Sequence, residues 1–129
     1  MDFEVPSNIS KEKEFVVEEK YLATFLGSGS VNVLSTPSMI LFMEMVSRIM
    51  MDEVLPPEYS TVGTQVCIKH LSATPEGAKV IARTSLKQQT GKRLLFNVEA
   101  WYNETKIGEG THERAIIDKK KFKERVVNK

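Results

Sequence analysis

The feature that most constrains this chain is a long apolar segment that follows Ser35-Thr36-Pro37. A hydroxyl side chain before a helix can accept a hydrogen bond from a free backbone N–H, and proline is well accepted at the first helical position. We therefore expect one helix from Pro37 to about Glu53, ended by Pro56-Pro57. Because a helix that is apolar on nearly every side has to be buried, this one predicts a core element. Its apolar residues are Met39, Ile40, Leu41, Phe42, Met43, Met45, Val46, Ile49, Met50 and Met51.

After the helix, the apolar pattern changes to two-residue alternation, which is typical of strands. A further strand candidate, Lys13 to Glu19, precedes the helix. Short turns between strands require antiparallel neighbours. An antiparallel sheet wrapped around one long central helix would bury such a helix, and this α+β architecture is the hot-dog fold. A ferredoxin-like fold would need a second helix between strands, for which no helical period is visible. The alternating runs are Val66 to His70, Ala78 to Leu86, Leu94 to Tyr102 and Ile107 to Ile117.

Length, charge and cysteine content narrow the class of protein further. A chain of 129 residues fits one domain, so we expect residues 1–129 to form a single domain. The net charge of +1 gives no global attraction to nucleic acid or to an anionic membrane. The stretch from Met39 to Met51 is too short to span a bilayer. With Cys67 as its only cysteine and no signal-peptide pattern at residues 1–6, the chain is expected in the cytoplasm, without structural zinc.

Glu44 interrupts the apolar helix between Met43 and Met45. Burying a carboxylate without partners costs several kcal/mol, so this residue needs an explanation. In one interpretation it pairs with Arg48 one turn later on the helix surface. In the other it lies in a cleft, where a carboxylate can act as a base or nucleophile.

His70 and Thr36 are the other candidates for chemistry. By alternation, His70 shares a strand face with Val66 and Ile68, and we expect this face to look at the helix. A lone histidine there is commonly a hydrogen-bonded core residue, but together with Glu44 it would supply two converging titratable groups. Helix capping alone explains Thr36, yet a helix N-terminus also suits a developing oxyanion. A hydroxyl, a carboxylate and an imidazole together indicate nucleophilic or hydrolytic chemistry.

Two other segments carry weaker signals. His112-Glu113-Arg114 resembles part of a zinc motif only superficially, because strand side chains alternate between faces and the helical pair of histidines is missing. The basic tail from Lys119 to Arg125 is expected to be a solvated end, and contact with the phosphates of coenzyme A is the alternative.

Three blocks of the chain together resemble the fluoroacetyl-CoA thioesterase and its relatives among hot-dog thioesterases. The resemblance runs from about Val33 to Lys123, which is most of the chain. Each block is modest alone, but their order and spacing are fairly specific. The blocks are Leu34-Ser35-Thr36-Pro37 with the apolar run through Met43-Glu44, then Gly63-Thr64 to His70 with Ala73-Thr74-Pro75 and Gly77, then Gly108 and Gly110-Thr111-His112-Glu113-Arg114-Ala115 ending at Lys121-Phe122.

The resemblance implies catalytic roles for Thr36, Glu44 and His70, which match the threonine, glutamate and histidine of the family. It implies that Gly63 supplies a backbone contact near the thioester carbonyl, and that Arg114 is a substrate or structural contact. The implied activity is hydrolysis of an acyl-CoA thioester to a free acid and coenzyme A, without a metal or other cofactor.

The chain departs from the family pattern between the first strand and the helix. Fluoroacetyl-specific enzymes carry a longer, phenylalanine-rich lid there, whereas this chain has the short segment Gly27-Ser28-Gly29-Ser30-Val31-Asn32 and one nearby aromatic residue, Phe25. This departure means that the resemblance implies an acyl-CoA substrate without fixing fluoroacetyl selectivity. Three alternatives are an acyl-CoA-binding or sensing protein without turnover, a hot-dog hydratase, whose aspartate–histidine motif is not found, and a structural dimer, which leaves Glu44 unexplained.

The spacing of Thr36 and Glu44 predicts how the site is assembled. Eight residues along one helix place them about 12 Å apart, too far for a direct hydrogen bond. Either the substrate bridges them, or each site takes Thr36 from one subunit and Glu44 from the other. We therefore expect a homodimer with a composite site, because a two-fold interface can bring the start of each helix near the middle of its partner.

Overall fold

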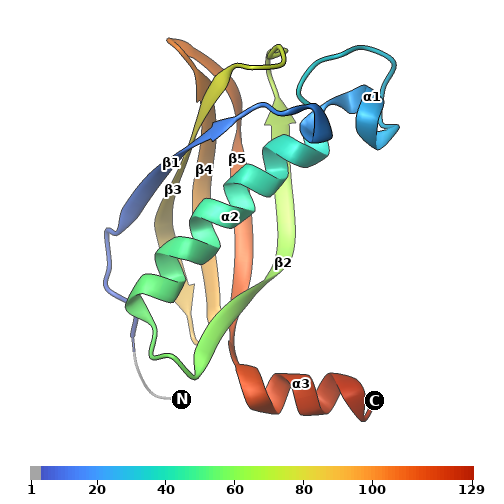
Figure 1. Cartoon of the computed structure of the whole chain (residues 1–129). Coiled ribbons are helices and arrows are strands. Elements are labelled where there is room, and N and C mark those ends of the chain that lie inside the picture. Colours follow the sequence, from blue (N-terminus) through green and yellow to red (C-terminus); the bar gives the residue numbers. More distant parts are fainter. Residues whose placement is uncertain (1–3) are drawn as a thin grey trace.

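The computed structural model describes residues 4–129 as one curved sheet with a long helix across one of its faces (Figure 1). In chain order the elements are β1 (Ser10–Val16), the 3-10 turn η1 (Glu19–Tyr21), α1 (Ala23–Leu26), α2 (Thr36–Val54), β2 (Tyr59–His70), β3 (Lys79–Thr90), β4 (Arg93–Tyr102), β5 (Thr105–Asp118) and α3 (Lys119–Val127).

All five strands form one antiparallel sheet in the order β1-β3-β4-β5-β2. Tight turns at Gly91-Lys92 and Asn103-Glu104 join β3, β4 and β5, and the left-handed backbone of Gly91 and Asn103 suits such turns. The strands that flank α2 in the sequence, β1 and β2, become the two edges of the sheet. The predicted α+β hot-dog architecture is therefore the one observed.

One side of α2 packs on the sheet and forms the core. Phe42, Met39, Met43, Val46 and Met51 are almost completely buried, and Phe42 stacks on Phe15 of β1. The buried hydroxyl of Ser47 donates to the Met43 carbonyl at 2.8 Å, and its oxygen lies 2.8 Å from the hydroxyl oxygen of Thr84 on β3. Since this polar group is satisfied, it ties the helix to the sheet without a desolvation penalty.

The expectation that α2 is buried on every side is wrong for the isolated chain. Leu41 is 41% exposed, and Ile40, Met45 and Ile49 are only half-buried. The reason is geometric, since one sheet covers one side of a helix. An apolar strip of α2 thus stays open on the side away from the sheet.

The element boundaries differ from the expected ones at several points. The first strand lies earlier than Lys13 to Glu19, because the chain enters the η1 turn at Glu19. The helix α2 is one residue longer at each end than predicted. The short helices α1 and α3 were not expected, although α3 is solvated like the predicted basic tail, with no buried residue. No helix within residues 4–129 is both long and apolar enough to cross a membrane.

Candidate functional site

The hydroxyl of Thr36, at the first residue of α2, lies against the last residue of β2. Ser35 is the N-cap of this helix, because its hydroxyl accepts a hydrogen bond of 3.1 Å from the Ser38 backbone N–H. The Thr36 hydroxyl is therefore not used for capping, and its Oγ1 lies 2.7 Å from Nδ1 of His70. The interpretation of Thr36 as a cap is wrong, since its neighbour has that role. We call Thr36 and His70 the helix-start pair.

The imidazole of His70 is half-buried in this pair. Burial lowers the pKa of His70 below its ordinary value of 6.5, and the nearby Ser72 backbone opposes this shift only partly. Its second nitrogen, Nε2, is buried and makes no hydrogen bond of good geometry with residues 4–129. His70 is consequently neutral at pH 7 and able to exchange a proton with the Thr36 hydroxyl.

Glu44 lies two turns further along α2 and faces β2 and β5. Its side chain is 39% exposed, and its Oε2 is 4.0 Å from Nη1 of Arg114. The predicted helix-surface pair with Arg48 does not form, because Arg48 Nη1 instead lies 2.9 Å from Asp52 Oδ2. The carboxylate is thus half-open and turned to the sheet side of the helix.

Gly63 brings the backbone of β2 against this carboxylate. A Cβ atom built on Gly63 would lie 3.0 Å from Glu44 Oε2, 3.3 Å from His112 Cε1 and 3.5 Å from Arg114 Nη1. The first two distances are tighter than ordinary contact, so any side chain here would push the carboxylate away. Glycine lets the backbone and the carboxylate approach each other.

A β-bulge explains why Gly63 and His70 lie on the same face of β2. The two residues are seven apart, so strict alternation would place them on opposite faces. The pairing of β2 with β5 shifts between Gly63 and Gln65, which skips Thr64. After this shift, Val66 pairs with His112 and His70 with Gly108, on the face that carries Gly63.

Arg114 is buried on the same face, on β5, and three of its nitrogens donate hydrogen bonds. Nε donates to Thr61 Oγ1 at 2.7 Å, Nη2 to the Thr61 carbonyl at 2.9 Å, and Nη1 to Nε2 of His112 at 3.0 Å. Burial lowers the pKa of Arg114, and the negative charge of Glu44 opposes this shift. A guanidinium remains charged in such a site, so it presents a fixed cation to Glu44.

The five predicted site residues lie on α2 or on the face of the sheet that looks toward α2, in two groups. One group is the helix-start pair. The other, which we call the glutamate cluster, consists of Glu44, Gly63, His112 and Arg114. Among residues 4–129, no hydrogen bond or ion pair joins Glu44 to His70. A single chain therefore holds two separate parts of the expected site.

His112 is a member of this cluster that the sequence did not single out. It appeared only within a superficial zinc motif, and residues 4–129 contain no group of three potential ligands that could hold a metal ion. The sequence does indicate its position, because His112 and Arg114 are two residues apart on one strand and their side chains therefore lie on the same face.

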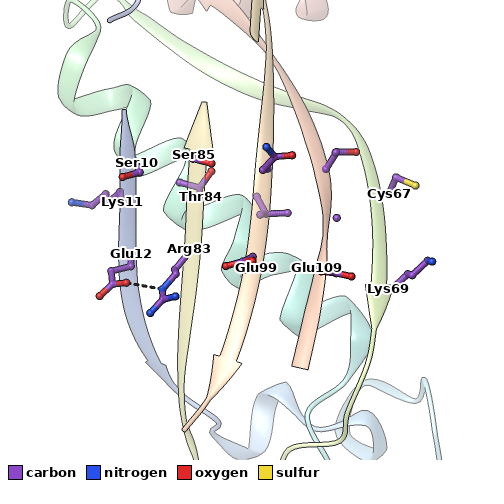
Figure 2. A pocket seen from close by; sticks show the side chains of 14 residues that line it. Ser10, Lys11, Glu12, Cys67, Lys69, Arg83, Thr84, Ser85, Glu99 and Glu109 are labelled. Atoms are coloured by element: carbon purple, nitrogen blue, oxygen red, sulfur yellow. Dashed lines mark hydrogen bonds and ion pairs between the residues drawn. The ribbon is translucent and has the colours of Figure 1, made fainter. Parts of the chain in front are cut away.

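A hollow of about 1000 Å³ lies on the opposite face of the sheet, away from all these residues. Figure 2 shows its charged side chains spread over all five strands. Arg83 Nε lies 2.8 Å from Glu12 Oε2, and Lys106, next to the hollow, pairs with Glu99 and Glu109. The charged residues that line the hollow are three basic and three acidic ones, so their charges balance.

Known proteins resemble this chain over most of its length. The family described as fluoroacetyl-CoA-specific thioesterase matches residues 17–120. The fluoroacetyl-CoA thioesterase of Streptantibioticus cattleyicolor is 37% identical over 97 residues, which cover 75% of this chain and 70% of that protein.

Solved structures give the same result. A structure of a fluoroacetyl-CoA thioesterase superposes with a TM-score of 0.90 at 30% identity, over 98% of each chain. A hot-dog-like protein of Thermanaerovibrio acidaminovorans superposes with a TM-score of 0.86 over 95% of this chain and 91% of that one. At 18% identity, this second likeness concerns the fold alone, and it confirms the hot-dog prediction.

Proposed function

Because this chain belongs to the fluoroacetyl-CoA-specific thioesterase family, we propose that it hydrolyses a small acyl-CoA thioester to a free acid and coenzyme A. The observation that carries this proposal is the position of the Glu44 carboxylate, 4.0 Å from a buried guanidinium and against a strand residue without a side chain. A substrate carbonyl is able to approach the strand backbone here, within reach of the carboxylate.

In the mechanism that we favour, backbone N–H groups near Gly63 or at the start of α2 polarise the thioester carbonyl. Glu44 and His70 activate the attacking oxygen, which belongs either to water or to the Thr36 hydroxyl. The Thr36–His70 contact of 2.7 Å supports proton transfer between these two groups. Thiolate is a good leaving group, so it leaves without strong protonation. Rapid quenching with labelled acyl-CoA distinguishes the two routes, because only attack by Thr36 leaves the label on the protein.

The two parts of the site come together in a homodimer. In one chain Thr36 and Glu44 are about 12 Å apart along α2. Leu41 is exposed on the uncovered side of that helix, and β2 is a sheet edge with an unpaired side. Both are surfaces that association would cover. Each active site then takes its helix-start pair from one subunit and its glutamate cluster from the other.

Mixing two inactive variants tests the composite site. Heterodimers of a Thr36→Ala subunit and a Glu44→Gln subunit contain one site with all groups intact, so they regain up to about half of the wild-type activity per site pair, by the symmetry of a two-fold dimer. Activity that stays at the level of the separate variants contradicts subunit sharing.

The segment between β1 and α2 lies beside the start of α2, where the Ser35 N–H donates to the Tyr21 carbonyl, and we propose that it covers the acyl group of the substrate. This segment is held at its base, where the Ala23 N–H donates to the Val33 carbonyl, and its tip exposes Phe25 and Val31. In Figure 1 the segment extends beyond the start of α2. A short cover with few aromatic residues supports acyl groups other than fluoroacetyl as substrates.

We also propose that residues 1–129 form one domain and that the protein is cytoplasmic, which suits the exposed free thiol of Cys67.

A panel of acyl-CoA esters, assayed for release of the free thiol, tests the proposed function. We expect turnover with short, small acyl groups and the highest kcat/KM with one of them. Tight binding of these esters with no thiol release from any of them would contradict the enzyme and identify an acyl-CoA-binding or sensing protein.

A further inference from the structure

His112 is the most buried ionisable residue of the glutamate cluster, with 1% of its surface exposed, and both of its ring nitrogens are in contact with polar atoms. Nδ1 lies 2.9 Å from the backbone carbonyl of Gln65, and Nε2 lies 3.0 Å from Nη1 of Arg114. A carbonyl only accepts and a guanidinium only donates. The two partners therefore fix one neutral tautomer, with the proton on Nδ1 and the lone pair on Nε2.

Each contact of His112 leads to a different part of the glutamate cluster. Gln65 is the residue at which regular pairing resumes after the β-bulge, so the first contact fastens the bulge that turns Gly63 toward Glu44. The second contact holds the same nitrogen of Arg114 that faces Glu44 at 4.0 Å. The ring thus links the strand that carries Gly63 to the guanidinium.

We propose that His112 is a positioning residue for thioester hydrolysis, whose neutral ring holds the Gly63 bulge and the Arg114 guanidinium on either side of Glu44. This proposal rests on the proposed thioesterase function. His112 does not touch the reacting atoms. It acts through the two groups that it holds in place.

The surroundings of His112 keep it in the required neutral form. Burial is the main cause that lowers the pKa of His112 below 6.5, and the positive charge of Arg114 lowers this pKa further. The hydrogen bond to the Gln65 backbone and the negative charge of Glu44 raise the pKa of His112, but only partly offset the lowering. On the remaining side the Phe96 ring of β4, which carries no charge, packs at 6.3 Å between ring centroids. Protonation of Nε2 would place its N–H against the N–H of Arg114 Nη1, and two donors cannot form a hydrogen bond. Acidification should therefore release the guanidinium from His112.

Two substitutions separate the two contacts. An asparagine amide nitrogen occupies the place of Nδ1, so His112→Asn keeps the bond to the Gln65 carbonyl and loses the acceptor for Arg114. His112→Gln does the reverse. We expect each variant to lose about tenfold in kcat/KM and His112→Phe, which loses both contacts, to lose about 100-fold. Thr111→Val, on the outer face of the same strand, is the matched control and keeps wild-type activity.

The pH profile gives a readout that a merely structural role would not move. In the wild type, protonation of both His70 and His112 lowers kcat/KM below about pH 6.5, the ordinary value for histidine. His112→Gln removes one of these titrations, so its acid limb falls less steeply. Wild-type kcat/KM in both single-contact variants, with an unchanged acid limb and unchanged thermal unfolding, overturns the proposal.

The ring ¹⁵N chemical shifts of His112 distinguish this failure from a failure of the proposed function. We expect the Nδ1–H tautomer at pH 7.5 in the wild-type protein, which NMR reads without any turnover. A wild type that hydrolyses no acyl-CoA contradicts the thioesterase, even if this tautomer is found. The Nε2–H tautomer or a charged ring contradicts the positioning role, even in an active enzyme.

Discussion

The strand β5 carries charged groups on both of its faces, and the two faces treat them differently. On the outer face, Glu109 lies 2.9 Å from the amine of Lys106, and the side chains of Lys106 and Glu109 are 32% and 46% exposed. On the inner face, the Arg114 side chain is only 7% exposed, and its nearest carboxylate, Glu44, is 4.0 Å away. The outer ion pairs are short and exposed to solvent. The inner pair has one buried partner, Arg114, and a longer distance between its charged atoms.

This difference distinguishes the exposed ion pairs of the outer face from the charged groups of the proposed active site. Exposed ion pairs contribute at most about 1 kcal/mol each, because water and salt screen them. A buried guanidinium that does not meet its carboxylate at full contact carries a desolvation cost that this one pair does not offset. A cost of this kind is typical of a site that binds or transforms a ligand, which agrees with the helix-facing location of the proposed active site.

The largest effect should follow from removing the inner cation. Arg114→Met keeps the bulk of the side chain but removes five donors, which leaves the Thr61 carbonyl and His112 Nε2 without their bonds. We expect the free energy of unfolding to fall by about 3 kcal/mol, with loss of most activity. Urea denaturation measures the first and thiol release the second.

Arg83→Met on the outer face is the matched control for this change. Its guanidinium is exposed and paired with Glu12. We expect it to cost less than about 1 kcal/mol. Equal losses for the two variants would remove the distinction between the faces.

The next effect concerns the contact between Gly63 and Glu44. In Gly63→Ala the new Cβ would lie 3.0 Å from Glu44 Oε2, so the carboxylate has to move by a few tenths of an ångström. We expect kcat to fall by about 100-fold, because misplaced catalytic groups are costly. Circular dichroism should show an intact fold. Unchanged kcat would mean that this carboxylate does not act at the Gly63 backbone.

Acidification should weaken the fold through the inner face. The pKa values of His70 and His112 are both lowered in the folded state, chiefly by burial. The unfolded chain therefore binds more protons than the folded one below about pH 6.5, and the unfolding free energy falls as the pH drops through this window. Urea unfolding at pH 7.5 and 5.5 measures the change. His112→Gln should reduce it, whereas an equal change in this variant would exclude His112 as a source.

The smallest effect is expected for Glu12→Gln on the outer face. Glu12 loses its charge but keeps an oxygen that accepts from Arg83 Nε, now 2.8 Å away. We expect a change in unfolding free energy of about 0.5 kcal/mol or less, and unaltered kcat/KM. A measurable loss of turnover would show that the outer hollow takes part in the reaction.

Much of the fold followed from the sequence, because one apolar helix and alternating strands leave few ways to bury the helix. The resemblance to a known family, and not periodicity, singled out Gly63 and Arg114 as site residues. What the pattern could not give was the bulge at Thr64, since alternation alone places Gly63 on the wrong face. The helix α3 was missed for a related reason, as it is solvated throughout and has no apolar period to detect.

The most direct test of the account is the rate of thioester hydrolysis by Glu44→Gln, compared with Glu109→Gln on the outer face. Both changes replace a carboxylate by an amide of the same shape. We expect kcat of Glu44→Gln to fall by about 1000-fold or more, at the scale of a lost catalytic group, with Glu109→Gln at the wild-type rate. Full activity of folded Glu44→Gln would contradict the claim that the inner carboxylate performs the reaction.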